Sequence, residues 1–193
     1  IGRGASGEVR RADYMGKKVA VKTWRDLGSE EGKDLLKEIG MMSHAFRHKN
    51  VVDFYGIYEH DGLPWLVMEL MPGGSLEQYY EAKKKSRRDG RWRPETRRAV
   101  SWVEDILSAL AYLHAQKPPV IHRDIKPANM LLTEDGRTVK IGDFGVSRRC
   151  PHSLRNGAVG TYRYMAPEIF RGEGQYTAAV DVYSFSLVMW YIF

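Results

Sequence analysis

The run Met71-Pro72-Gly73-Gly74 divides the sequence into two parts that differ in pattern. Proline and paired glycines interrupt regular structure, so we expect a hinge over residues 71–74. Upstream of the hinge, short alternations of apolar and polar residues predict strands. Downstream, apolar residues recur at helical spacing between residues 99 and 113. The sequence therefore predicts an α+β, bilobal fold with a β-rich N-lobe over residues 1–70 and a helical C-lobe over residues 75–193.

Local signals place the individual elements. We expect strands at residues 9–14, 17–23, 51–59, 65–70, 130–132 and 138–141, and a helix at residues 29–43. Met15-Gly16 is expected to turn the first hairpin. Ser75 has the side chain of a helix N-cap, and Pro94 suits the first position of a second helix. Leu107 lies on the apolar stripe of that second helix.

Both ends of the chain point to a longer protein. The sequence begins at Ile1 inside a glycine-rich motif and ends at Phe193 within an apolar run. We therefore expect a domain truncated at both ends, without the last helices of its C-lobe. The single Cys150 excludes an internal disulfide framework and suits a cytoplasmic protein. No apolar run reaches the length of about 18 residues that a membrane span requires.

The net charge of +6 is concentrated in the segment Lys83–Arg93. Of the 30 basic and 24 acidic residues in the chain, seven basic residues and one acidic residue lie there, which leaves 23 of each sign elsewhere. A balanced remainder argues against a nucleic-acid partner. We expect the segment to be a solvated loop between two helices. A docking site for an acidic protein or for anionic lipid is the alternative.

Two early motifs have the composition of a nucleotide site. The glycines of Gly2-x-Gly4-x-x-Gly7 allow backbone amides to approach phosphate oxygens. A dinucleotide-binding fold would need a helix after the third glycine, whereas a hairpin is predicted there. On the next strand, Ala20 and Lys22 share one face, with room for a flat base and a charge for its phosphates. Glu38, on the expected helix, is a candidate partner for Lys22.

The segment His122–Asn129 has the side chains that phosphoryl transfer needs. Asp124 can accept or orient a hydroxyl proton, Lys126 can balance phosphate charge, and Asn129 offers a metal ligand. Asp143 follows a predicted strand and offers a second one. Hard carboxylate and amide oxygens favour Mg²⁺ over zinc.

These elements occur in the order that is typical of the eukaryotic protein kinase superfamily, which the chain resembles over essentially its whole length. They are IGRGASGEV, VAVK, a helix glutamate, a hinge, HRDIKPAN, DFG and APE. The resemblance implies the kinase fold, ATP and Mg²⁺ as cofactors, and transfer of the γ-phosphoryl group of ATP to proteins. Catalytic roles then fall on Asp124 as base, Lys126 at the γ-phosphate, Lys22 at the α- and β-phosphates and Glu38 as the partner of Lys22.

The resemblance also implies the binding residues. Asn129 and Asp143 are similar to the metal ligands of the family. Nucleotide contacts are expected at Ile1, Gly2, Gly4, Gly7, Val9, Ala20, Lys22, Glu69, Met71 and Leu131. The spine that links the lobes would comprise Met42, Phe54, His122 and Phe144, with Asp181 as its anchor. A pseudokinase scaffold is the competing interpretation, but such a protein normally lacks at least one catalytic residue.

The kind of kinase is indicated by two further segments. Lys126 within DIKPAN and the segment GTYRYMAPE resemble serine/threonine kinases, with Thr161 placed to contact Asp124 and Lys126. GTYRYMAPE and DVYSFSLVMW are most similar to the tyrosine-kinase-like group, whose members phosphorylate serine and threonine. The resemblance thus implies protein substrates bearing serine or threonine, and an upstream activating kinase as a further partner. Arg123 is similar to a family arginine that binds a phosphate on the activation loop. That loop offers Ser147, Ser153, Thr161 and Tyr162, of which we favour Ser153 as the regulatory site.

Overall fold

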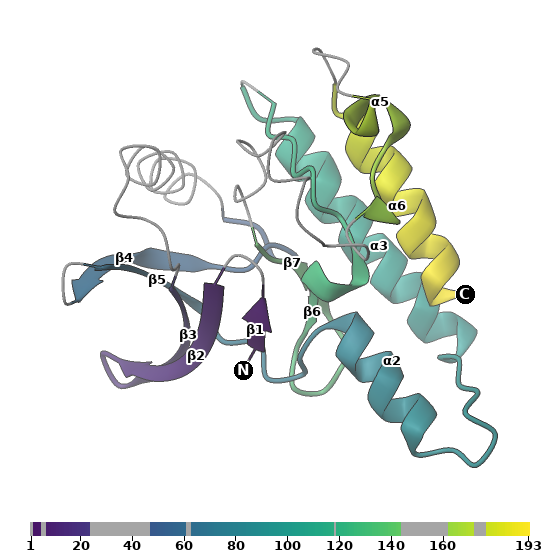
Figure 1. Ribbon diagram of the computed structural model, residues 1–193, viewed down its shortest axis with the longest axis horizontal. Coiled ribbons are helices and arrows are strands. Elements are labelled where there is room, and N and C mark those ends of the chain that lie inside the picture. The colour runs from purple at the N-terminus through teal and green to yellow at the C-terminus, as the bar shows by residue number, and fades with distance from the viewer. Residues whose placement is uncertain are drawn as a thin grey trace.

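A sheet-rich lobe and a helical lobe make up the protein (Figure 1). The computed structural model describes residues 2–4, 7–23, 47–60, 63–117, 119–143, 162–171 and 177–193. The α+β class and the two lobes agree with the prediction, and the boundaries proposed at residues 70 and 75 stay a prediction. The expected helix at 29–43, with Glu38 and Met42, lies outside the described residues. So does most of the segment that contains Ser153 and Thr161.

The sheet-rich lobe is one five-stranded antiparallel sheet with the order β1-β2-β3-β5-β4. Its strands are β1 (Gly2–Gly4), β2 (Gly7–Tyr14), β3 (Lys17–Thr23), β4 (Phe54–His60) and β5 (Leu63–Glu69). Met15 and Gly16 turn the β2–β3 hairpin at φ values of 49° and 75°. Two consecutive positive φ values match the twist of the flanking strands, which confirms the predicted turn.

Strand β4 begins at Phe54, three positions later than predicted. The preceding residues serve the other lobe instead. Val51 forms an isolated bridge with Ile141, and the Val52 amide donates to the Ile141 carbonyl at 3.0 Å. Apolar character alone cannot separate a strand from a segment that packs across two lobes.

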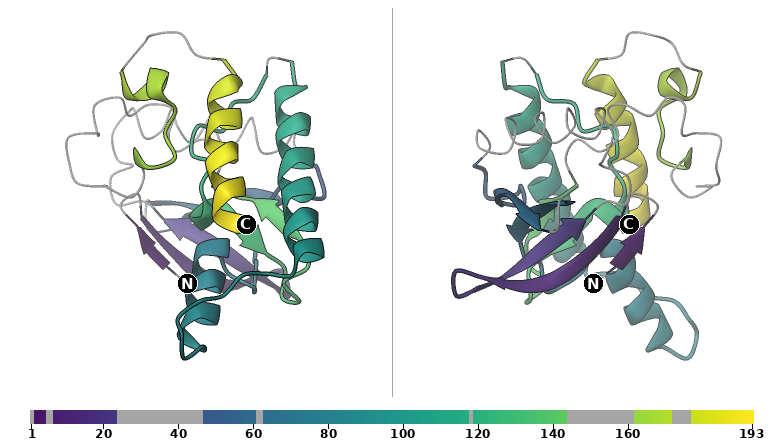
Figure 2. Two further views of the ribbon diagram at one scale, coloured as in Figure 1. Left: turned by 90° about the vertical axis from the view of Figure 1, so that its right-hand side faces the viewer. Right: turned by 60° about the vertical axis from the view of Figure 1, so that its left-hand side comes forward.

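The helical lobe stacks helices against a two-stranded hairpin. Its elements are α2 (Leu76–Lys85), α3 (Thr96–His114), the 3-10 turn η1 (Pro127–Asn129), β6 (Met130–Leu132), β7 (Val139–Ile141), α5 (Pro167–Phe170) and α6 (Ala179–Ile192). Helices α3 and α6 run side by side, with the β6–β7 hairpin between them and the large sheet (Figures 1 and 2). No helix within the described ranges is long and apolar enough to cross a membrane.

The helix starts test the predicted caps. Ser75 is the N-cap of α2: its Oγ accepts from the Gln78 amide at 3.2 Å, and Gln78 Oε1 accepts from the Ser75 amide at 3.0 Å. That reciprocal pair is a capping box. The prediction for Pro94 is wrong, because Glu95 is extended at ψ 142° and α3 begins only at Thr96.

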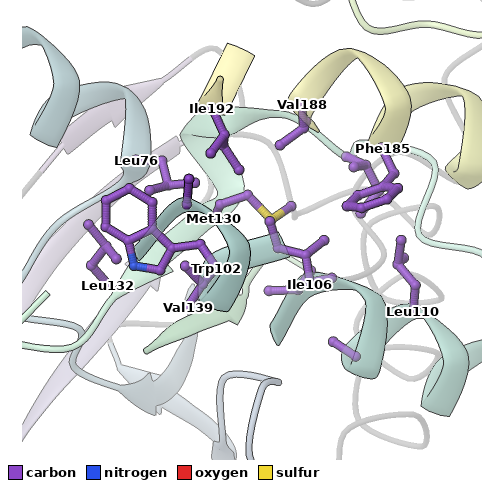
Figure 3. Close-up of a cluster of buried hydrophobic side chains, with 14 of the residues drawn as sticks. Leu76, Trp102, Ile106, Leu110, Met130, Leu132, Val139, Phe185, Val188 and Ile192 are labelled. Atoms are coloured by element: carbon purple, nitrogen blue, oxygen red, sulfur yellow. The ribbon is translucent and has the colours of Figure 1, made fainter. Parts of the chain in front are cut away.

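One core cluster binds the helical lobe together (Figure 3). Trp102 belongs to this cluster and has no exposed surface, and its indole Nε1 donates to the Gly136 carbonyl at 3.1 Å. The cluster includes Leu76, Ile106, Leu110, Met130, Leu132, Val139, Phe185, Val188 and Ile192. Leu107 is 47% exposed, so its predicted place in the core is wrong; it lies beyond the edge of the buried face of α3. The packed hairpin is a rigid base for the loops before β6 and after β7.

Candidate active site

Lys22 and Asp143 meet across 121 positions of sequence. Lys22 lies on β3, opposite Val9 of β2 and Leu66 of β5, and is only 5% exposed. A buried ammonium group needs a compensating charge. Its Nζ lies 2.5 Å from Asp143 Oδ1, and the Asp143 side chain is 31% exposed. The structure therefore joins two of the residues that the sequence selected, one from each lobe.

The backbone that holds Asp143 is tightly constrained. Asp143 has a φ of 63°, in the left-handed region that residues other than glycine rarely adopt. The preceding Gly142 donates its N–H to the Asn129 carbonyl at 3.0 Å. A Cβ atom at Gly142 would lie 2.9 Å from Leu131 Cδ1, so a side chain there would displace Leu131. Asp143 is thus held next to the segment that carries Asn129.

Asp124 lies close to Lys126 and Asn129, the two residues that were predicted to act with it in phosphoryl transfer. Its Oδ2 accepts a hydrogen bond from Asn129 Nδ2 at 2.8 Å and lies 2.8 Å from Lys126 Nζ. Asn129 Nδ2 also donates to the Asp124 carbonyl at 2.7 Å. The carboxylate is therefore oriented by an amide and balanced by an ammonium group, and its side chain stays 20% exposed for a substrate.

Asp181 of α6 forms hydrogen bonds with the backbone at the start of this loop. Its side chain is fully buried, Oδ2 accepts from the His122 amide at 2.8 Å, and Oδ1 accepts from the Arg123 amide at 2.7 Å. His114 Nε2 donates to Oδ2 at 2.9 Å. Burial pushes the pKa of Asp181 up, but the bonds from His114, Arg123 and His122 outweigh it and leave the pKa below its ordinary value. The predicted anchor therefore holds the loop through a charged carboxylate.

His122 connects the two halves of the site. Its Nε2 lies 3.0 Å from the Gly142 carbonyl, and its Nδ1 accepts from the Asp124 amide at 3.3 Å. Since a carbonyl only accepts, the ring proton lies on Nε2. This one buried ring therefore ties the loop of Asp124 to the residue before Asp143.

Four of the predicted nucleotide contacts (Ala20, Glu69, Met71 and Leu131) lie in or next to the hinge and the β6–β7 hairpin. Ala20 lies opposite Met68, one position before Glu69. Met71 is buried, and Leu131 forms an isolated bridge with Ser75 just after the hinge. The Gly73 amide donates to the Leu132 carbonyl at 3.1 Å, which holds the hinge against the hairpin.

The glycine-rich segment forms a hairpin of β1 and β2, and the hairpin that was predicted after Gly7 is β2–β3. Gly2 lies opposite Val9, and Gly4 lies opposite Gly7. Since β2 and not a helix follows Gly7, the dinucleotide-binding alternative is wrong. Ile1 and Glu38 lie outside the described residues, as does Phe144 of the expected spine.

Sequence reasoning missed a second ion pair at the site. Lys140 of β7 contacts the Glu69 carboxylate at 2.7 Å. The pattern of β7 held half of the signal, since Val139 and Ile141 are buried and Lys140 points to the other face. Nothing in the sequence identified its partner.

Comparison with known proteins gives one consistent family. The model of the protein kinase domain matches residues 1–193. Mitogen-activated protein kinase kinase kinase 7 of Drosophila melanogaster is 38% identical over 98% of this chain and 26% of its own length. Serine/threonine-protein kinase VIK of Arabidopsis thaliana is 35% identical over 98% of this chain and 43% of its own length.

A third relative carries a different acceptor in its name. Seven transmembrane domain-containing tyrosine-protein kinase 1 of Dictyostelium discoideum is 37% identical over 100% of this chain and 28% of its own length. The chain thus spans less than half the length of each of these three relatives. The matches confirm the resemblance to eukaryotic protein kinases of the tyrosine-kinase-like type. The chain belongs to the protein kinase domain family, whose members use ATP and a divalent metal.

Proposed function

We propose that the protein is an ATP-dependent serine/threonine kinase, which transfers the γ-phosphoryl group of Mg-ATP to hydroxyl groups of protein substrates. The observation that carries this proposal is the convergence of Asp124 with Lys126 and Asn129, beside the Lys22–Asp143 pair. A carboxylate base, phosphate-binding cations and oxygen ligands for a metal are the groups that phosphoryl transfer needs. A pseudokinase is disfavoured because these residues are all present.

Each side chain has a role that its surroundings support. Asp124 accepts or orients the proton of the substrate hydroxyl, and Asn129 and Lys126 hold its carboxylate in position. Lys126 also contacts the γ-phosphate. Lys22 contacts the α- and β-phosphates, and Asp143 is its counter-charge in this structure. Glu38 is the second proposed partner of Lys22.

Asn129 and Asp143 fit a magnesium site. Both offer hard oxygen atoms, and the bond from the Gly142 amide to the Asn129 carbonyl keeps them adjacent. Mg²⁺ ordinarily takes one or two protein ligands and completes its shell with phosphates and water. When bound, the ion neutralises the charge that develops on the phosphates. The proposed adenine contacts are the backbone of Glu69 and Met71, with Ala20, Val9, Ile1 and Leu131 around the base and Gly2, Gly4 and Gly7 over the phosphates.

Acceptor identity is the direct test of the proposed function. We expect the full-length protein, given labelled ATP and a peptide library, to label serine and threonine residues. Phosphoamino-acid analysis of the products measures this. Phosphotyrosine as the sole product would contradict the acceptor assignment, and a folded protein that labels no peptide would contradict the activity.

Magnesium removal is expected to abolish peptide phosphorylation. Asn129 and Asp143 would hold the phosphates only through the ion, and a bare Asp143 carboxylate repels them, so excess EDTA should lower the rate by at least about 100-fold. Added Mg²⁺ should restore it, because EDTA removes the ion without unfolding the chain. Circular dichroism on the same samples checks that point. Turnover that persists in EDTA would contradict the proposed role of Asn129 and Asp143.

The segment Lys83–Arg93 is proposed as a docking surface for an acidic segment of a partner protein. None of its seven basic side chains forms a salt bridge within the part of the chain that the structure describes. The expected loop begins later than predicted, because Lys83, Lys84 and Lys85 form the last turn of α2. At the other end of the segment, Trp92 packs edge-on against Tyr80 with the ring centroids 5.1 Å apart, and Arg93 Nε donates to the Phe193 carbonyl at 3.0 Å. Since no large apolar side chain of the segment is exposed, a membrane anchor is less well supported.

Substitution of Lys83, Lys84, Lys85, Arg87 and Arg88 by glutamine tests this surface. We expect binding of a fluorescent polyglutamate peptide to weaken by at least about tenfold, because exposed ion pairs contribute roughly 0.2–1 kcal/mol each. Fluorescence anisotropy measures the affinity, and the control replaces the exposed Arg11 and Lys17 by glutamine. Equal affinity in wild type and variant would contradict the proposal. Loss of binding to phosphatidylserine vesicles alone would assign the surface to membranes instead.

Two further proposals concern context. We propose that the protein acts in the cytoplasm, with the lone cysteine as support, and that an upstream kinase modifies Ser153. An unmodified Ser153 in fully active protein, seen by mass spectrometry, would contradict the second proposal.

A further inference from the structure

Lys140 of the helical lobe binds the side chain of Glu69, the last residue of β5 before the hinge. Lys140 Nζ donates to both carboxylate oxygens of Glu69, at 2.8 and 2.7 Å. The two side chains are only 14% and 23% exposed, and they lie 71 positions apart in the sequence. A partly buried, two-oxygen contact of this kind is stronger and better defined than an exposed surface pair.

The Glu69 carboxylate is also held from the side. The Asp53 amide donates to Glu69 Oε2 at 3.1 Å, and the Glu69 amide donates to the Asp53 carbonyl at 2.8 Å. The side chain of Glu69 is thus fixed between Asp53, just before β4, and Lys140 of β7, and the Glu69 backbone is fixed by Asp53 as well. A shift of Lys140 would therefore be transmitted to the backbone of the hinge.

Both partners stand beside proposed nucleotide contacts. Lys140 lies directly opposite Leu131 in the β6–β7 hairpin, so the two side chains share one face. Leu131 is the proposed floor under the adenine, and the Glu69 backbone is a proposed contact of its edge. Asp143 lies two residues after the end of β7, the strand that carries Lys140.

The hinge is tied to the hairpin on its other side by backbone bonds. The Gly73 amide donates to the Leu132 carbonyl at 3.1 Å, and the Leu132 amide donates to the Gly74 carbonyl at 2.8 Å. Residues 69–71 therefore run between a side-chain tie at Glu69 and a backbone tie at Gly73. That arrangement sets the height of the hinge above Leu131.

We propose that the Glu69–Lys140 pair positions ATP: it holds the hinge over the β6–β7 hairpin at the spacing in which Glu69, Met71 and Leu131 contact the adenine together. Glu69 and Lys140 act here as positioning residues through their side chains. The inference rests on the proposed function, because it assigns the pair to the same nucleotide site. It predicts an effect on nucleotide affinity that a pair with a purely structural role would not have.

Charge reversal separates these roles. In the full-length protein, Glu69→Lys and Lys140→Glu are each expected to raise KM for ATP by about tenfold and to change kcat by less than about twofold, the pattern of lost binding without lost chemistry. The double variant Glu69→Lys/Lys140→Glu should recover most of the affinity. Lys140→Arg should stay near wild type, because a guanidinium group can contact both carboxylate oxygens.

The matched control is the exposed pair Lys18–Asp13, whose Nζ–Oδ1 distance is 2.7 Å. Lys18→Glu is expected to leave KM for ATP unchanged. Thermal unfolding is measured on every variant. Single variants that lower Tm but keep KM within about twofold would overturn the inference, as would a double variant no better than the singles.

A binding measurement keeps the inference separate from the proposed activity. Equilibrium titration with a fluorescent ATP analogue gives Kd for each variant without any transfer of phosphate. A wild-type protein that binds the analogue but phosphorylates no peptide would contradict the proposed function, while the ratio of Kd values would still decide the role of the pair. Equal Kd values in wild type and in both single variants would overturn it.

Discussion

Replacement of Asp124 by asparagine is expected to lower kcat by about 10²–10⁴-fold, the usual contribution of a positioned general base. Asparagine keeps the shape of the side chain and an oxygen that can accept from Asn129 and Lys126, but it carries no charge and its amide does not take up a proton. The free energy of unfolding should therefore change little, which separates this variant from a folding defect. Steady-state peptide phosphorylation by the full-length protein measures kcat, and a fluorescent ATP analogue measures nucleotide affinity.

Nucleotide affinity and a control variant distinguish loss of the base at Asp124 from other effects. Affinity for the ATP analogue should stay within about threefold of wild type, because Asp124 belongs to the hydroxyl side of the site. Asp135→Asn is the control, since Asp135 lies on an exposed turn. Its Oδ1 accepts a hydrogen bond from Thr133 Oγ1 at 2.6 Å. A kcat for Asp124→Asn within threefold of the Asp135→Asn value would contradict the proposed base.

Replacement of Asp181 by alanine is expected to lower the free energy of unfolding by about 3–5 kcal/mol, as when one partner of a buried charged network is removed. The change removes a fully buried carboxylate and leaves the amides of His122 and Arg123 and the ring of His114 without that acceptor. We also expect kcat to fall, because the loop that starts at His122 carries Asp124. Urea denaturation of the full-length protein measures the stability of the domain.

The control for Asp181 is Asp13→Ala, at an exposed carboxylate, where a change within about 0.5 kcal/mol is expected. The pKa of Asp181 is lowered by folding, so its carboxylate stabilises the fold above its ordinary pKa, and that contribution is lost as the pH falls through the lower folded value. The contribution of the Asp181 carboxylate to the difference between wild type and Asp181→Ala should therefore be present in full at pH 5 and shrink below about pH 4. Equal stability of Asp181→Ala and Asp13→Ala at pH 7 would contradict the anchor role.

The sequence predicted the catalytic loop well because its chemistry is local. Asp124, Lys126 and Asn129 lie within one short segment, and the structure joins all three through Asp124 Oδ2. Most strands and the Ser75 cap were also predicted, since alternation and capping depend on near neighbours. The error at Pro94 arose because a proline that suits a first helical position can also precede the helix, which begins at Thr96. The error at Leu107 arose because apolar spacing does not show where the buried face of a helix ends.

Contacts between distant segments could not be predicted in the same way. Asp143 was selected as a metal ligand, and its contact with Lys22 appeared only in the structure. Lys140 resembled an ordinary solvent-facing lysine between two buried strand residues, and its partner Glu69 lies 71 positions away. Periodicity places a side chain on a face, but the opposing lobe decides what that face meets.

A crystal structure of the protein with Mg²⁺ and a non-hydrolysable ATP analogue tests the central claim most directly. We predict the metal against Asn129 and Asp143, the phosphates beside Lys22, and the adenine between Ala20 and Leu131. A nucleotide bound elsewhere, or a metal that contacts neither Asn129 nor Asp143, would contradict the account.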